Sequence, residues 1–153
     1  MERQESIDFA RKYVEDLLSF FGVNVEVQAH AEDEVIEIEV APSELSSVLI
    51  GRNAETLRSL QYIVATTLRN KGAALDRVNL DIAGYKKQHA EKLAEKARGW
   101  IEQVRTTGDS FVGDLNAADR RIVHHVASEY SDIRTFSEGE GRERRIIIAQ
   151  KSS

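Results

Sequence analysis

The segment VLIGRNAETLRSLQYIV, residues 48–64, predicts a short helix, a tight turn and a second, longer helix. Gly51 allows the backbone to turn sharply and another part of the chain to come close, because glycine has no β-carbon. Asn53 is expected to be the N-cap of the longer helix, since its side-chain oxygen can accept a hydrogen bond from a free helix amide. After it, apolar residues recur at helical spacing and form one face: Leu57, Leu60, Val64 and Leu68.

The start of the longer helix is a candidate anion site. Amides at a helix N-terminus attract anions, above all phosphate. Arg52 in the turn and Arg58 on the helix supply charge of the matching sign. If Ala54 lies in the first helical turn it needs no positive φ, and alanine is a better helix former than glycine. A helix-turn-helix corner in which Gly51 only relieves strain is the alternative interpretation of the glycine alone.

Composition narrows the class of protein. The chain has 153 residues, 41% of them hydrophobic, and no cysteine, so it can form one medium domain or two small ones without disulfides. No apolar run reaches the roughly 20 residues that span a bilayer. The acidic and polar start, MERQES, does not resemble a signal peptide. We therefore expect a cytoplasmic protein without direct membrane insertion.

Charge is segregated along the chain. The formal net charge is −5, but residues 1–50 contain 3 Lys/Arg and 12 Asp/Glu, whereas residues 51–153 contain 18 Lys/Arg and 14 Asp/Glu. The sign of the charge therefore changes at the glycine turn. Because binding depends on the local field, the negative total does not exclude a nucleic-acid partner.

Hydrophobic periodicity predicts an α+β fold for the first part of the chain. Residues 7–21 have the spacing of an amphipathic helix. Strict alternation of apolar and polar residues predicts three strands, at residues 23–28, 36–40 and 78–82. With the two helices around Gly51, the order is helix, strand, strand, helix, glycine turn, helix, strand. This order makes a small sheet with helices on one face.

The remainder of the chain predicts a second α+β unit. It consists of a long helix, a short strand, a second helix and a hairpin, at residues 84–106, 110–112, 117–128 and 133–149. The long helix is expected to connect the units and to pack as the first helix of the second one. Its lysines predict a solvated face: Lys86, Lys87, Lys92 and Lys96. Asn116 is expected to be the N-cap of the second helix.

Two Arg/His pairs lie on that second helix. Arg120 and His124 are four residues apart and share a face, and Arg121 and His125 form a second pair one residue further on. A guanidinium beside an imidazole suits a phosphate group. The alternative is that these are ordinary surface residues of an amphipathic helix. No spacing in the sequence fits a catalytic or metal-binding arrangement, so we expect no enzyme activity, no metal and no cofactor.

The residues around Gly51 resemble the Gly-x-x-Gly loop and following helix of a KH domain, a single-stranded RNA-binding module whose loop clamps the nucleotide backbone. The order of elements over residues 1–83 is that of the prokaryotic KH fold. The sequence departs from the motif at Ala54, where the second glycine would stand. The resemblance implies a base groove flanked by Leu49 and Ile50. It also implies RNA contacts from the turn and its neighbours: Ile50, Gly51, Arg52, Asn53, Ala54 and Arg58.

Later segments resemble an R3H domain, a small module that binds single-stranded nucleic acid. The resemblance rests on Asp119-Arg-Arg-Ile-Val-His124, Asp132-Ile-Arg-Thr-Phe-Ser-Glu-Gly139 and Arg144-Arg-Ile-Ile-Ile, and it covers residues 84–153. By this match Arg120 and His124 are the Arg-x-x-x-His pair that names the domain. The exposed charge around them is expected to come from Arg121, Arg144 and Arg145.

A KH domain followed by an R3H domain resembles the Jag, or SpoIIIJ-associated, family of bacterial RNA-binding proteins, also called KhpB. The resemblance implies a post-transcriptional regulator that binds single-stranded RNA and is linked to cell elongation and division. It also implies a small KH-only partner protein, and it leaves single-stranded DNA and a homodimer open. Many members have a further N-terminal domain, which this sequence is expected to lack. The alternative is a protein-interaction adaptor with weak or no RNA affinity, which Ala54 and the acidic first part favour.

Overall fold

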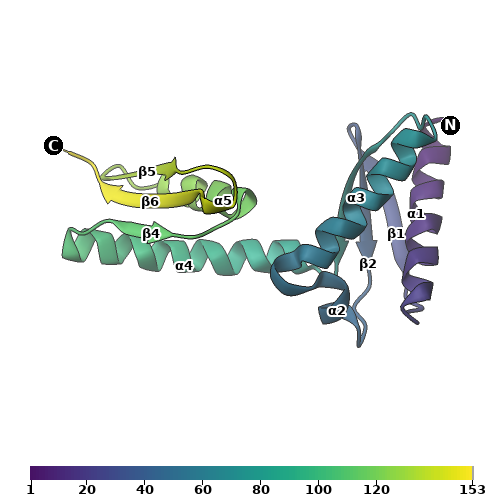
Figure 1. Ribbon diagram of the computed structural model, residues 1–153, viewed down its shortest axis with the longest axis horizontal. Coiled ribbons are helices and arrows are strands. Elements are labelled where there is room, and N and C mark those ends of the chain that lie inside the picture. Colours follow the sequence, from purple (N-terminus) through teal and green to yellow (C-terminus); the bar gives the residue numbers. More distant parts are fainter. Residues whose placement is uncertain (153) are drawn as a thin grey trace. The chain divides into compact units, whose positions relative to one another are not determined.

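The computed structural model describes residues 1–152, which form two compact units (Figure 1). The first unit spans Met1–Lys86 and the second begins at Lys87. Each unit has its own three-stranded sheet and its own hydrophobic core. The predicted α+β class is therefore confirmed. No helix within residues 1–152 combines the length and the apolar character needed to cross a membrane.

The first unit contains three strands and three α-helices. In chain order they are α1 (Arg3–Phe20), β1 (Val27–Glu32), β2 (Val35–Val40), α2 (Ser46–Ile50), the 3-10 turn η1 (Arg52–Ala54), α3 (Glu55–Asn70) and β3 (Arg77–Ile82). The sheet order is β1-β2-β3, with β2 antiparallel to β1 and parallel to β3. Parallel neighbours need a crossover connection. Here α2, η1 and α3 make it, so the glycine turn lies inside the crossover.

The core of the first unit lies between its sheet and the two long helices, α1 and α3 (Figure 1). Ile36, Ile38 and Val40 of β2 are buried, while Glu39 between them is exposed, as the two-residue period of a strand requires. The same face of β3 and the inner faces of α1 and α3 complete the core, with Val14, Val64, Leu68 and Leu80 among its buried side chains.

The first strand lies further along the chain than the alternation predicted. A strand was expected at residues 23–28, but β1 is Val27–Glu32, and the turn before β2 shrinks to Asp33 and Glu34. Ala29 and Ala31 pack against the core from β1. Alanine is a poor strand former, so these inward positions gave no signal, whereas the valines before them did.

The second unit contains α4 (Tyr85–Thr107), which starts just before the boundary, β4 (Phe111–Gly113), α5 (Ala117–Ala127), β5 (Ile133–Glu138), the 3-10 turn η2 (Gly141–Glu143) and β6 (Arg145–Gln150). Its sheet order is β4-β6-β5, with both pairings antiparallel. The predicted hairpin is therefore confirmed as β5 and β6. Asn116 is confirmed as the N-cap of α5, since its Oδ1 accepts a hydrogen bond from the Asp119 amide at 2.9 Å.

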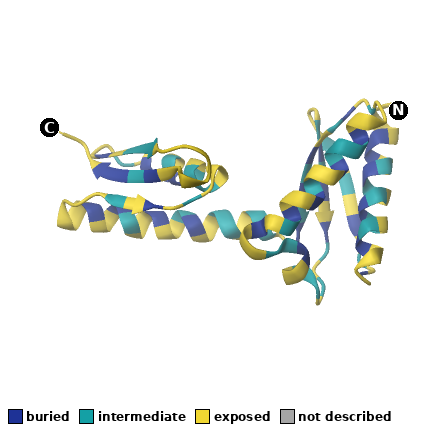
Figure 2. Cartoon of the chain, viewed as in Figure 1, coloured by how far each residue is buried: buried dark blue, intermediate teal, exposed yellow. Residues whose placement is uncertain are grey.

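Both helices of the second unit pack against the same face of its sheet. Ile101 of α4 and Val123 of α5 are fully buried together with Ile146 and Ile148 of β6. Trp100 of α4 stacks on Phe111 of β4 with 4.5 Å between the ring centroids. Figure 2 shows the consequence on α4, where buried and exposed residues alternate along the helix. Neither α4 nor α5 packs against the opposite face of the sheet.

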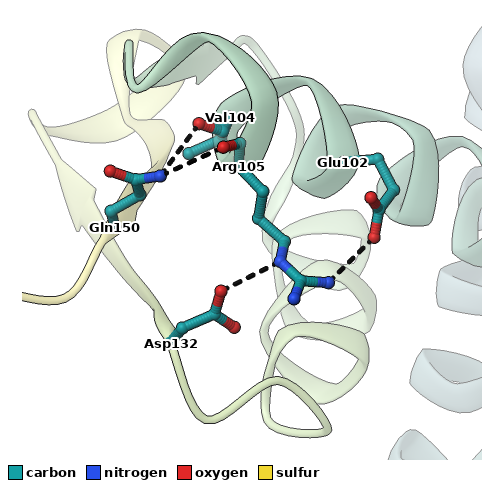
Figure 3. A network of polar contacts seen from close by, with 5 residues as sticks. All are labelled: Glu102, Val104, Arg105, Asp132 and Gln150. Atoms are coloured by element: carbon teal, nitrogen blue, oxygen red, sulfur yellow. Dashed lines mark hydrogen bonds and ion pairs between the residues drawn. The ribbon is translucent and has the colours of Figure 1, made fainter.

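The C-terminal end of α4 is fixed to the sheet by polar contacts (Figure 3). The Gln150 side-chain amide donates to the carbonyl oxygens of Val104 at 3.4 Å and Arg105 at 3.3 Å. The Arg105 guanidinium lies 2.9 Å from the Asp132 carboxylate and 3.0 Å from that of Glu102. These two carboxylates, Asp132 first, raise the pKa of Arg105 above its ordinary value. The contacts join α4 to the last residue of β6 and to the turn before β5.

Candidate functional site

The turn after α2 consists largely of residues with positive φ. Gly51 has φ 77° and ψ 176°, and Asn53 and Ala54 have φ 55° and 58°. A β-carbon at Gly51 would lie 2.4 Å from Thr56 Oγ1 and 2.9 Å from the Thr56 amide nitrogen. Real β-carbons do not approach other atoms so closely. Gly51 is therefore needed for its backbone conformation and for the close approach of Thr56.

The expectation that Asn53 is the N-cap is wrong, and the condition considered for Ala54 is not met. Ala54 does not lie in a helical turn: with φ 58° and ψ 26° it is left-handed, and it occupies the N-cap position of α3 that was expected of Asn53. No side chain caps that end of α3. Instead, the Asn53 carbonyl accepts a hydrogen bond from Arg58 Nη1 at 2.5 Å. A left-handed conformation costs an L-residue about 1–2 kcal/mol, so position 54 is one that glycine would fill without strain.

The backbone amides of the turn are only partly engaged. The Gly51 amide completes α2, the Ala54 amide donates to the Gly51 carbonyl at 3.2 Å, and the Glu55 amide donates to the Arg52 carbonyl. The amides of Arg52 and Asn53 have no acceptor anywhere in residues 1–152. Both residues are exposed. Two available donors beside a guanidinium can bind an anion.

Apolar residues beside the turn differ in exposure. Ile50 is half-buried, but Leu49 is buried in the core, so the expectation that Leu49 lines a base groove is wrong. Large apolar side chains are exposed elsewhere on the crossover. Val48 of α2 is 57% exposed and Tyr62 of α3 is 70% exposed, with Ile63 next to it also exposed. The crossover therefore presents apolar surface as well as charge.

In the second unit, Arg120 is bound to the backbone of two other segments. Its Nη1 donates to the Leu115 carbonyl at 2.7 Å and to the Arg144 carbonyl at 3.3 Å. The guanidinium thus joins the start of α5 to the segment that leads into β6. Its Nε and Nη2 have no acceptor within residues 1–152, so they can still donate to a ligand.

The His124 ring is half-buried and contacts β5. Its Nδ1 lies 2.5 Å from Thr135 Oγ1, and its Nε2 lies 3.4 Å from Ser137 Oγ. Burial, followed by the positive charge of Arg120, lowers the pKa of His124 below its ordinary value of 6.5. The ring is therefore neutral at pH 7 and is held in one orientation by the two hydroxyl groups.

The second Arg/His pair has different surroundings. Arg121 and His125 are exposed and line an open groove between α4 and α5, whose apolar floor includes Ala94, Ile122 and Val126. The structure thus brings Arg120, His124 and the Arg144 backbone together, but it places Arg121 apart from them. Two further predicted residues, Arg144 and Arg145, are exposed on the hairpin, and Arg144 Nη1 donates to the Gly139 carbonyl at 2.8 Å.

One polar cluster was missed by the sequence analysis. Lys86 was expected on a solvated face, but its Nζ donates to Gln61 Oε1 at 2.8 Å and to Asn79 Oδ1 at 2.5 Å. Burial lowers the pKa of Lys86, against the opposing charges of Asp81 and Glu37. Its partners come from α3 and β3, so helical spacing gave no signal of this cluster. Among residues 1–152, no group of His, Asp and Glu side chains could hold a metal ion.

Comparison with known proteins defines the class. Residues 86–150 match the R3H domain family, and this range contains Arg120 and His124. This part of the chain is therefore similar to an R3H domain. It is also similar over most of its length to proteins named RNA-binding protein KhpB.

Three of these relatives show the extent of the similarity. The protein of Clostridium symbiosum is 28% identical over 153 residues, which cover 98% of this chain and 69% of the relative. That of Bacillus subtilis is 24% identical over 154 residues, covering 99% and 74%. That of Streptococcus pneumoniae strain D39 is 22% identical over 137 residues, covering 89% and 42%. The predicted resemblance to the Jag/KhpB family is thereby confirmed.

Proposed function

We propose that this protein binds single-stranded RNA and that the turn at Gly51–Ala54 holds the sugar-phosphate backbone. The observation that carries the proposal is the exposed turn itself, in which the amides of Arg52 and Asn53 have no acceptor in residues 1–152. These donors lie beside the Arg52 side chain at the start of α3, where a helix dipole favours an anion. The relatives named RNA-binding protein KhpB support the same partner.

A second contact is proposed on α5. Arg120 keeps its Nε and Nη2 donors available, so it can bind a phosphate while its Nη1 remains on the Leu115 and Arg144 carbonyls. His124 orients this region through β5, and the exposed side chains of Arg121, Arg144 and Arg145 add positive charge. In this proposal the protein is a binding protein without catalytic chemistry. Its regulatory role and its KH-only partner protein are proposals drawn from the family resemblance, and its cytoplasmic location is a proposal drawn from its composition.

The experiment is a polarisation assay with a fluorescently labelled single-stranded oligoribonucleotide over a range of salt concentrations. Affinity of the parent chain should fall steeply with salt, because phosphate contacts release counterions. The double variant Arg52→Asp/Asn53→Asp should lose at least about tenfold in affinity. The slope of the logarithm of its affinity against the logarithm of the salt concentration should decrease in magnitude by about one, since one cationic contact is lost. A flat salt dependence in the parent would contradict the proposal.

A matched control separates the turn from general charge. The double variant Asn24→Asp/Arg77→Asp changes the same two residue types at exposed positions of the first unit. Arg77 begins β3, beyond the far end of α3 from the turn. This variant should keep nearly the parental affinity. If both double variants lose affinity equally, the turn is not the clamp. Circular dichroism and thermal melting establish that each variant is folded.

A protein-interaction adaptor is the second candidate, because α3 exposes Tyr62 and Ile63 side by side in sequence. Exposed apolar side chains that form a continuous patch mark interaction sites. This candidate expects the variant Tyr62→Ser/Ile63→Ser to lose nuclease-resistant association with a purified KH-only protein while its RNA affinity stays parental. If the parent itself has no RNA affinity at moderate salt but associates with that protein, the adaptor function replaces RNA binding.

A further inference from the structure

The outward face of the second sheet carries a continuous apolar row. Strand pairing places Val112 of β4 opposite Ile147 of β6, and Ile147 opposite Phe136 of β5. On either side of Ile147, Ile146 and Ile148 are fully buried in the core that the helices cover. Since side chains alternate between the two faces of a strand, the three row residues point away from α4 and α5.

This row is accessible to a partner. Val112 is 53% exposed, and Phe136 and Ile147 are half-buried. Within the described residues, none of the three belongs to the core cluster or to the side chains packed against it. Figure 2 shows part of β4 in the colour of exposed residues. An apolar row that crosses all strands of a sheet and stays in contact with water is a feature that partners commonly cover.

Arginines lie on either side of the row on the same face. Arg134, two residues before Phe136 on β5, holds its guanidinium 5.2 Å from the centre of the Phe136 ring. Arg145, two residues before Ile147 on β6, is exposed. Neither arginine forms an ion pair within residues 1–152. Glu138 lies opposite Arg145, so the face has two positive charges and one negative charge.

We infer that this face, through Phe136 and the neighbouring Arg134, stacks unpaired bases of the bound strand. Nucleobases stack on aromatic rings and on guanidinium planes in single-stranded complexes. The two arginines complement the phosphates between the stacked bases. The inference rests on the proposed function. It adds a contact on the face of the sheet opposite to His124, whose ring contacts Thr135 and Ser137 on the helix-covered side of β5.

The test uses the full chain, the variant Phe136→Leu and two labelled oligoribonucleotides of equal length. One oligonucleotide carries its bases and the other has abasic sites through its central part, so that the phosphates are equal in number. Phe136→Leu keeps an apolar side chain and removes the ring. It should bind the base-bearing strand about tenfold more weakly than the parent and the abasic strand as tightly as the parent. The control Phe20→Leu, which changes a phenylalanine that is 87% exposed in the first unit, should change neither affinity.

Other outcomes would overturn the inference. Parental affinity of Phe136→Leu for the base-bearing strand would show that the face is not used for RNA. If Phe136→Leu kept parental RNA affinity but lost association with a partner protein, the face would be a protein interface instead. Equal weakening for both strands would show that the ring only supports the fold. If the parent binds neither strand, the proposed function fails, and this inference fails with it. If Arg52→Asp/Asn53→Asp lost RNA binding and Phe136→Leu bound normally, the turn would be an RNA contact and the sheet face would not.

Discussion

Thr56 lies so close to Gly51 that a β-carbon at position 51 would be 2.4 Å from the Thr56 hydroxyl oxygen. Gly51 also has φ 77° and ψ 176°, a region almost confined to glycine. The variant Gly51→Ala should therefore lower the free energy of unfolding by about 2–6 kcal/mol, from backbone strain of about 1–3 kcal/mol and overpacking of similar size. Urea denaturation followed by circular dichroism measures the change.

Alanine variants of two other glycines distinguish the cost of backbone strain from the cost of steric crowding. Gly22 has φ 76° but nothing within 4 Å of an added β-carbon, so Gly22→Ala should lose about 1 kcal/mol from strain alone. Gly99 lies within α4 with no positive φ and no neighbour within 4 Å. Gly99→Ala should gain about 0.5–1 kcal/mol, because alanine favours a helix. If Gly51→Ala were no worse than Gly22→Ala, the contact with Thr56 would not constrain the turn.

Ala54 is strained in its left-handed conformation, so Ala54→Gly should stabilise the chain. Relief of about 1–2 kcal/mol of strain exceeds the loss of one buried methyl group, about 0.8 kcal/mol. We expect a net gain of about 0.5 kcal/mol in the free energy of unfolding. Asn53→Gly is the matched comparison, and its gain should be smaller because asparagine tolerates this region. Ala54→Val should be clearly destabilising, since a β-branched side chain cannot adopt positive φ without a large cost.

Periodicity predicted most helices and strands because their buried residues are large and regularly spaced. Ile36, Ile38 and Val40 alternate strictly, and they form β2 as expected. The pattern failed for β1, where Ala29 and Ala31 occupy the inward positions and are too small to stand out. Local propensity also gave no indication of the backbone conformation of Ala54. A helix former there would fit a helical residue, whereas the turn imposes a left-handed one.

The candidate site was predictable in residue type more than in geometry. Spacing alone placed Arg120 beside His124 on one helix face, and the structure keeps them together. What spacing could not give is the Arg120 bond to the Arg144 carbonyl or the His124 contact with Thr135, because these partners lie on other elements. The apolar row on the outward sheet face was missed for the same reason, since it exists only once three strands pair in register.

Arg120 and Arg121 are neighbours in sequence and should differ in their effect on stability. Arg120→Ala removes a charged donor from the Leu115 and Arg144 carbonyls and should cost about 1–2 kcal/mol, because hydrogen bonds to charged groups are worth more than neutral ones. Arg121 is exposed, so Arg121→Ala should change the free energy of unfolding by less than about 0.5 kcal/mol. Chemical denaturation of both variants gives the comparison. Equal effects would mean that the carbonyl contacts of Arg120 do not stabilise the second unit.

The lowered pKa of His124 makes the stability of the folded chain depend on pH. Its folded pKa lies below 6.5, the value expected of an unfolded chain, because burial and Arg120 disfavour the imidazolium. As the pH falls, the unfolded chain therefore binds a proton first. The contribution of the neutral ring is complete above pH ~7 and is lost as the pH falls from ~6.5 through the folded pKa. Denaturation at several pH values should show this loss in the parent and in the exposed control His125→Gln, but less of it in His124→Gln. An NMR titration that placed the His124 pKa above 6.5 would contradict the contact geometry with Thr135 and Ser137, since a ring held neutral by burial cannot gain a proton more readily than one in water.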